Sequence, residues 1–291
     1  MEIKQRLCPE HFWVVDELLS GVAACGSKLP FVARAVAWIP QKDDFNMAQR
    51  VKRLLIPLIL IMTLPVFAAV PDNTLTTEEA HSGWMLLFNG RTTEHWRGAY
   101  AATFPNKGWA VVDGELRGQL SGGMESGDGG DIVTLQTYRS FEMSFDWKLG
   151  PGGNSGVKYF VEERQPKPQG SQPGYEYQII DDANYIYRDQ HLSPVLKTAS
   201  IYDVVAATKP DVAMDVWHRS RIVVRGDHIE HWLDGQKVLG ISRKSKEFIS
   251  GVHTSKFHDY PGFGEIKSGH ILLQDHGHNV AFKNLKIKRL D

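Results

Sequence analysis

The stretch FEMSFDWKL, residues 141–149, decides the fold class, because apolar and polar residues alternate along its whole length. In an extended chain, neighbouring side chains point to opposite sides, so five large apolar residues fall on one side: Phe141, Met143, Phe145, Trp147 and Leu149. A period of two is typical of a β-strand with one face in the core and the other towards water. The alternation therefore predicts a long strand at the heart of a sheet.

Short apolar runs and glycine turns recur on both sides of this strand. Asp113-Gly114 and Asp234-Gly235 each separate two such runs, and Asp-Gly in that setting is a strong hairpin signal. Strands do not alternate with helical segments, so the sequence predicts an all-β sandwich of antiparallel sheets. Further strands are predicted at residues 156–161, 175–180, 219–225, 269–274 and 280–287.

The composition excludes several classes of partner and site. The formal net charge is −1, so nothing indicates a nucleic acid or an anionic membrane surface as partner. Both cysteines, Cys8 and Cys25, lie near the N-terminus. The predicted β domain therefore contains neither a disulfide nor a thiolate metal site.

A secretory signal peptide is predicted at residues 47–69. The basic stretch MAQRVKR, residues 47–53, precedes 13 uncharged residues and a small-residue end at Ala69. This apolar run is shorter than the ~20 residues that a spanning helix needs, although an N-terminal membrane anchor is the alternative. We expect translation to start at Met47, residues 1–46 to be an artefactual extension, and the mature protein to be periplasmic or secreted, without stable insertion in the membrane.

The remaining chain is expected to form one domain. Residues 70–81 are predicted to be a linker with a short helix, and residues 82–291 a single β-sandwich. Two long loops are expected, at 162–174 and 181–215. Loops of that length in a compact domain are usually functional or carry small elements of their own.

Four segments together carry a resemblance to a known family: GWMLLFNG at 83–90, PGGNSGVKY at 151–159, GYEYQIIDD at 174–182 and GHILLQDHG at 269–277. Their order and spacing resemble the 3-keto-disaccharide hydrolase family, formerly a domain of unknown function. The chain departs from the usual pattern at Asp234, where Asn is common, and at DVWH, residues 215–218, where Gly-Glu-Trp-Asn is common.

The resemblance covers about residues 82–290 and implies both a fold and an activity. The fold would be a concanavalin-like jelly roll of two curved antiparallel sheets, with a carbohydrate cleft on the concave face. The activity would be hydrolysis of glycosides already oxidised at C3 of one sugar, so the expected partner is a small 3-keto carbohydrate.

The chemistry of such a substrate defines the groups that an enzyme needs. A C3 keto group acidifies the hydrogen on C2, so that the glycosidic oxygen on C1 can leave by elimination and water can add afterwards. This route requires a general base, a stabiliser of the enolate and an acid for the leaving group. A divalent metal ion is a possible cofactor, because a Lewis acid could stabilise the enolate.

Glu176 is the first candidate for the base or a metal ligand. It shares one strand face with Gln178, a candidate for substrate binding, and the alternative for both is a solvated outer face. Asp181, at the strand end, could bind a sugar hydroxyl or a metal ion, or could cap a turn through its side chain.

His276 is a candidate base, acid or metal ligand, because imidazole titrates near neutrality. By alternation it shares a face with Gln274, a candidate for substrate binding. His231 is a further candidate for substrate binding, with a half-buried structural histidine as the alternative. His278 is interpreted as a loop residue.

The remaining candidates lie in glycine-rich or aromatic surroundings. Asn154 could bind sugar hydroxyls or simply belong to a turn, and Lys158 could act in catalysis by stabilising the enolate. Lys256 resembles a family position of similar type and is expected to bind substrate. Sugar-stacking rings could come from Tyr187, Tyr202, Trp96 and Trp232, although such aromatics are more often part of a core.

Two other functions remain open. A non-catalytic carbohydrate-binding module could use the same sandwich, since fold alone does not decide function. An ordinary glycosidase of the laminarinase type would need a Glu-x-Asp-x-x-Glu strand, which the sequence does not contain.

Overall fold

The computed structural model describes residues 70–124, 127–167, 173–187 and 190–291. The predicted signal peptide, the expected start at Met47 and both cysteines lie outside these residues. Among the described residues, no helix has the length and apolar character that a membrane crossing requires.

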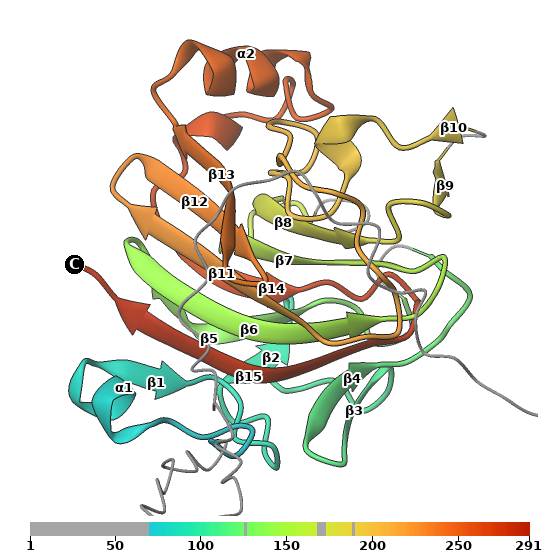
Figure 1. The fold of residues 1–291 in the computed structure, drawn as a ribbon, viewed down its shortest axis with the longest axis vertical. Coiled ribbons are helices and arrows are strands. Elements are labelled where there is room, and N and C mark those ends of the chain that lie inside the picture. The colour runs from blue at the N-terminus through green and yellow to red at the C-terminus, as the bar shows by residue number, and fades with distance from the viewer. Residues whose placement is uncertain (1–69, 125–126, 168–172, 188–189) are drawn as a thin grey trace, which may run out of the picture. The chain divides into compact units, whose positions relative to one another are not determined.

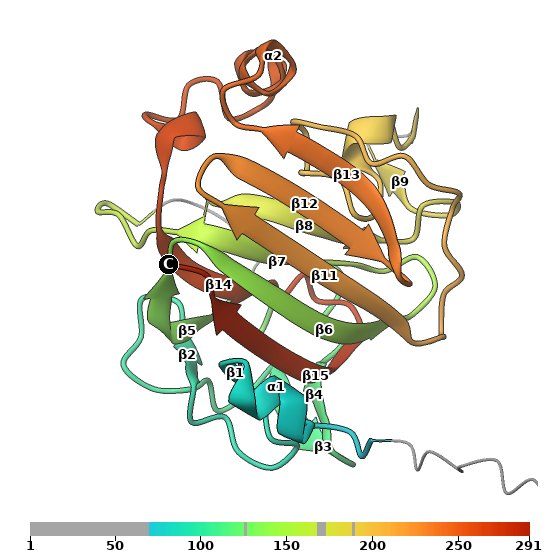
Figure 2. The ribbon, with the colours of Figure 1, turned by 60° about the vertical axis from the view of Figure 1, so that its left-hand side comes forward.

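Two antiparallel sheets form the body of the domain, and Figures 1 and 2 show their strands curving together. The larger sheet has the order β13-β12-β11-β6-β15-β4-β3, with β1 paired to β15. The smaller sheet has the order β2-β5-β14-β7-β8. The strands of the larger sheet are β1 (Trp84–Leu86), β3 (Trp109–Val112), β4 (Glu115–Gly118), β6 (Phe141–Leu149), β11 (His218–Arg225), β12 (His228–Leu233), β13 (Gln236–Ser242) and β15 (Val280–Arg289). Those of the smaller sheet are β2 (Trp96–Gly98), β5 (Ile132–Tyr138), β7 (Asn154–Val161), β8 (Tyr175–Ile180) and β14 (Gly269–Leu273).

Short elements surround the sheets. The two-stranded hairpin of β9 and β10 and the 3-10 helix η1 follow β8 along the chain. Helix α2 and the 3-10 helix η2 lie between β13 and β14 in sequence. Their bounds are α1 (Thr77–His81), α2 (Lys246–Thr254), η1 (Pro194–Leu196), η2 (Phe263–Glu265), β9 (Ile186–Tyr187) and β10 (Gln190–His191).

The apolar face of β6 forms the centre of the core, as its alternation predicts. All five of its large apolar residues are buried, and the ring of Phe145 meets that of Tyr177 edge to face at 5.5 Å. Tyr177 belongs to β8 of the other sheet, so this contact joins the two layers. The predicted all-β jelly-roll sandwich of two curved antiparallel sheets is confirmed.

Both predicted hairpin turns are present. Asp113 and Gly114 between β3 and β4 have φ of 52° and 78°, and Asp234 and Gly235 between β12 and β13 have φ of 47° and 81°. Positive φ at both central residues is the geometry that Asp-Gly favours, and its twist matches that of the paired strands.

The short helix expected in residues 70–81 is α1. Its N-terminus carries a capping box, in which Thr76 Oγ1 accepts from Glu79 N at 3.1 Å and the Glu79 carboxylate accepts from Thr76 N at 3.0 Å. Such a box satisfies two amide groups that a helix start leaves without partners.

Strands β7 and β8 are buried along their whole length on both faces. One face of β8 carries Tyr175, Tyr177 and Ile179 into the core. The other face carries Glu176 and Gln178 away from the larger sheet, yet these polar residues are 5% and 1% exposed. A second layer must therefore cover the outer face of the smaller sheet. Residues 181–187 and 190–205, drawn in yellow beside β8 in Figure 1, supply part of it.

Candidate active site

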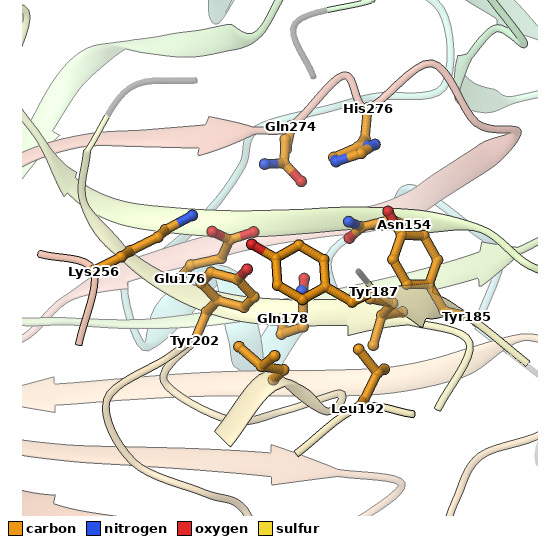
Figure 3. Close-up of a pocket in the computed structure, with 12 residues that line it drawn as sticks. Asn154, Glu176, Gln178, Tyr185, Tyr187, Leu192, Tyr202, Lys256, Gln274 and His276 are labelled. Carbon is orange, nitrogen blue, oxygen red and sulfur yellow. The ribbon is translucent and has the colours of Figure 1, made fainter. Parts of the chain in front are cut away.

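A pocket lies between the outer face of the smaller sheet and its cover (Figure 3). Six of the nine predicted site residues line it, and they come from four separate parts of the chain. Glu176 and His276 share this one cavity. Its lining consists of Asn154, Glu176, Gln178, Ile180, Tyr185, Tyr187, Leu192, Leu196, Tyr202, Lys256, Gln274 and His276.

The carboxylate of Glu176 is held by two positions of the neighbouring strand. Glu176 pairs in register with Lys158, and Lys158 Nζ lies 3.4 Å from Glu176 Oε2. A Cβ atom at Gly156 would lie 2.3 Å from Glu176 Oε1, so only glycine leaves room for the carboxylate where it is. The orientation of Glu176 is therefore set by β7, a strand inside the sheet.

Lys158 contacts the carboxylate rather than the cavity. Its side chain is 7% exposed and that of Glu176 is 6% exposed, so the ion pair is buried. Lys158 does not belong to the pocket lining, whereas Glu176 does. The structure thus places the predicted catalytic lysine behind the predicted base.

Two buried amides of the pocket have oxygen atoms without a hydrogen-bond partner among the described residues. They are Oδ1 of Asn154 and Oε1 of Gln274, in residues that are 9% and 4% exposed. A buried polar atom without a partner costs about 1–3 kcal/mol. A sugar hydroxyl both donates and accepts, so it can satisfy such an amide in either orientation.

His276 is stacked against a second imidazole. The rings of His276 and His278 lie 5.4 Å apart at 24°, and Tyr185 meets His278 edge-on at 6.2 Å. Burial, and next the neighbouring His276, lower the pKa of His278 below its ordinary value. The neutral form of His278 is therefore favoured, and its ring packs against the pocket residue His276. The interpretation of His278 as a loop residue did not indicate this contact.

An aromatic and apolar wall closes the pocket opposite the sheet. Tyr187 and Tyr202, both predicted, belong to this wall, and so do Tyr185, Leu192 and Leu196, which the sequence analysis missed. Their segment is fixed to the sheet because Tyr202 N donates to Glu176 O at 3.0 Å and Ala199 N to Gln178 O at 2.8 Å.

A buried ion pair anchors the same wall. Lys209 Nζ binds Asp182 Oδ2, and Thr198 N donates to Asp182 Oδ1 at 2.7 Å. The two charged side chains are 4% and 0% exposed. These contacts link three points of the segment that follows β8.

The structure does not bring Asp181 into the pocket. Its carboxylate accepts from Gly152 N at 2.8 Å and from Asn184 N and Nδ2, both at 3.1 Å. Burial alone would raise the pKa of Asp181, but the hydrogen bonds from Gly152 and Asn184 outweigh it and lower the pKa. Asp181 thus has the turn-capping role that was its alternative, because its acceptor sites are already used by the loops it joins.

His231 also lies elsewhere, in the core between the sheets. Its Nδ1 is 2.7 Å from Ala199 O and its Nε2 is 3.0 Å from the hydroxyl of Tyr159. Complete burial lowers its pKa from 6.5 to about 4. It is the structural histidine that was its alternative, since β12 points it inward.

Two predicted stacking residues lie outside the pocket as well. Trp96 is 3% exposed and its Nε1 donates to Leu87 O at 2.7 Å. Trp232 packs under the guanidinium of Arg221 at 4.0 Å from the ring centroid. Both rings therefore contact other parts of the domain and do not face the pocket.

The three residues considered as possible metal ligands are not assembled as a set. Glu176 and His276 reach the pocket, but Asp181 does not. In the part of the chain that the structure describes, no three His, Cys, Asp or Glu side chains are placed to hold a metal ion together. The described residues therefore offer no assembled set of three such ligands for a metal ion.

The pattern of the family described as "3-keto-alpha-glucoside-1,2-lyase-like domain" matches residues 83–288. The chain is 31% identical over 230 residues to the 3-keto-disaccharide hydrolase of Bacteroides thetaiotaomicron, which covers 72% of this chain and 79% of that protein.

Two solved structures are similar to this chain in fold. A candidate glycosyl hydrolase of Parabacteroides distasonis is 34% identical, with a TM-score of 0.68, and covers 76% of this chain and 100% of its own. A second candidate glycosyl hydrolase from the same organism is 24% identical, with a TM-score of 0.55 and coverage of 71% and 99%, and shows the fold alone.

These matches confirm the family resemblance and the predicted enzyme class, a hydrolase of glycosyl bonds. The match extends from β1 into β15, so it covers both sheets and every strand that contributes to the pocket. The chain therefore belongs to the family of 3-keto-alpha-glucoside-1,2-lyase-like domains.

Proposed function

We propose that this protein cleaves the glycosidic bond of 3-keto-disaccharides and related 3-keto-glycosides, by proton abstraction at C2, elimination at C1 and hydration. One observation carries the proposal. A buried carboxylate, held in place by a lysine and a glycine of the next strand, opens into a pocket with unsatisfied amide oxygens. This combination offers a base of fixed direction together with groups that bind hydroxyls.

In the proposed reaction, Glu176 takes the proton from C2. The electron pair of the C2–H bond forms a double bond between C2 and C3, and negative charge moves to the C3 oxygen. When the C3 carbonyl forms again, the pair makes a bond between C2 and C1, and the C1–O bond breaks. The leaving oxygen gains a proton, and Glu176 releases to solvent the proton that it took. Water then adds to the enone, with hydroxyl at C1 and a proton at C2, so the net change is hydrolysis.

The other polar residues would orient the sugar and stabilise its charge. His276 faces the same cavity as Glu176 and could donate a hydrogen bond to the C3 oxygen as charge builds there. The hydroxyl groups of the sugar would be bound by the amides Asn154, Gln178 and Gln274. Lys256 lies at the opposite side of the pocket from His276 in Figure 3. Lys158 would hold the Glu176 carboxylate in position.

The test compares oxidised with unoxidised sugars. Purified protein is incubated with 3-keto-trehalose or 3-keto-lactose, and in parallel with trehalose or lactose, with and without chelator. We expect release of a free 3-keto monosaccharide from the oxidised sugars alone. Binding without turnover would support a carbohydrate-binding module, and cleavage of trehalose or lactose an ordinary glycosidase.

Isotope incorporation tests the route. In D₂O, elimination followed by hydration places deuterium at C2 of the released keto sugar during turnover. Direct hydrolysis leaves hydrogen there, once slow exchange of the free product has been measured and subtracted. Product without enzyme-dependent deuterium at C2 would refute the elimination.

A further inference from the structure

The proposed elimination needs an acid as well as a base. When the C1–O bond breaks, a sugar leaving group departs as an alkoxide, which is a poor leaving group unless its oxygen is protonated. The inference below rests on the proposed function and concerns the source of this proton.

Tyr202 lies next to Glu176 because their backbones are joined. Tyr202 N donates to Glu176 O at 3.0 Å, so the wall segment and β8 run side by side at this point. Both side chains line the pocket, and Figure 3 shows the hydroxyl of Tyr202 turned towards the Glu176 carboxylate. A substrate whose C2 meets Glu176 thus presents the adjacent C1–O bond near the phenol.

Lys256 places a positive charge beside this phenol. Its Nζ lies 4.6 Å from the centroid of the Tyr202 ring. The position of Lys256 is fixed by its own backbone, because Lys256 N donates to Asp203 Oδ2 at 2.7 Å, one residue after Tyr202. An ammonium group at this distance stabilises the negative charge that remains on a phenol after it gives up a proton.

From this arrangement we propose that Tyr202 is the general acid for the leaving group and that Lys256 is its positioning and charge-stabilising partner. As the C1–O bond breaks, its electron pair goes to the leaving oxygen, which takes the proton from Tyr202 Oη. Tyr202 becomes a phenolate beside Lys256. The water that adds across the enone gives its hydroxide to C1, and its proton restores the phenol. Glu176 exchanges the proton it took with solvent and then protonates C2.

The proposal separates substrates by their leaving groups. A 4-nitrophenolate leaves without protonation, whereas a sugar alkoxide does not. We expect Tyr202→Phe to lower kcat/KM for 3-keto-lactose by ~100-fold or more, a usual contribution of one proton transfer. For the 4-nitrophenyl glycoside of 3-keto-glucose the loss should be several times smaller. Lys256→Met should show the same dependence on the leaving group, and Lys256→Arg should restore part of the activity because it keeps the charge.

Controls separate this role from structural effects. Tyr260→Phe removes a hydroxyl from a ring that packs on Phe263 and Arg164, away from the pocket, and should change neither substrate's rate. An equal loss on both substrates in Tyr202→Phe would show a purely structural role and overturn the proposal. So would a selective loss in Tyr187→Phe with none in Tyr202→Phe.

Failure of the proposed function is a distinct outcome. If the wild-type protein cleaves neither 3-keto substrate, the proposed function fails and this assignment with it. If the wild-type protein cleaves both and Tyr202→Phe shows no leaving-group dependence, the function stands and only the acid assignment is refuted.

Discussion

At the scale of single residues, Gly156 is the position on which the direction of the base depends. In Gly156→Ala the new methyl group would displace the Glu176 carboxylate, whose flexible end can move at small cost in stability. We expect kcat on a 3-keto substrate to fall by ~10-fold or more, since geometry contributes strongly to proton transfer, with little change in the melting temperature. Steady-state kinetics and thermal unfolding measure both.

Gly240→Ala is the matched control, because Gly240 also lies in a paired strand. A Cβ there would meet only the Lys237 side chain, at 3.8 Å, so kcat should stay at the wild-type value. A fully active Gly156→Ala would contradict the view that this carboxylate must be held where it lies.

Removing the charge of Glu176 tests its role directly. Glu176→Gln keeps the shape of the side chain but cannot accept a proton, so turnover should fall by ~100-fold or more. Glu247→Gln, on the first turn of α2 and outside the pocket, should have no effect. Near-wild-type turnover by Glu176→Gln would remove Glu176 from the role of base.

Buried His231 should make stability depend on pH. Its pKa is about 4 in the folded protein and 6.5 ordinarily, so the unfolded chain binds more protons between these values. Its contribution is fully present above pH ~6.5, declines as pH falls, and is lost near pH ~4, with a total on the order of 3 kcal/mol. Urea unfolding at pH 7 and pH 5 measures the slope. His231→Gln should flatten it, and an unchanged slope would assign the dependence to other groups.

At the scale of elements, the part of the wall before Tyr202, residues 181–187 and 190–201, is expected to control substrate binding more than chemistry. Asp182→Asn breaks the buried pair with Lys209 and should loosen the wall. KM should rise while kcat changes less, and amide hydrogen exchange in the wall should become faster than in β6. Asp211→Asn is the control, because its pair with Lys197 is 2.8 Å long but partly exposed, at 31% and 48%, and such pairs add little. Equal effects of the two variants would argue against the wall as a binding element.

Strands could be predicted where one face is buried and the other is solvated. Alternation identified β6, and Asp-Gly turns identified two hairpins. Strand β5 could not be predicted from alternation, because three of the four residues from Ile132 to Leu135 are buried in succession. Helix α2 was missed as well, because nine residues are too few for a clear period.

From the sequence, site residues could be grouped only where they share one face of a predicted strand. Alternation correctly grouped Glu176 with Gln178, but it cannot say which face of a strand meets the other sheet. For His231 the correct face could have been inferred from its neighbours. Ile229 and Leu233 lie on the same face of β12 and are apolar and buried, so this face points into the core. The tyrosine wall gave no such signal, since its shape is set by hydrogen bonds to β8 and by the Asp182–Lys209 pair.

At the scale of the whole molecule, export is the prediction that stands on sequence alone. Expressed from Met47 in a Gram-negative host, the protein should reach the periplasm, and N-terminal sequencing should find Val70 as the first residue. Retention in the cytoplasm at full length, or an intact precursor beginning at Met1 in the native host, would contradict the predicted leader.

The covered outer face of the smaller sheet has a consequence for how this enzyme could diversify. The floor of the pocket is formed by strands of the smaller sheet. The tyrosines and leucines opposite this floor come from a single segment that follows β8. A chimera that receives this segment from a relative, with Tyr202 retained, should therefore keep its reaction and acquire the donor's choice of leaving group. Transplanting α1 and its flanks, which contribute no residue to the pocket lining, should alter neither.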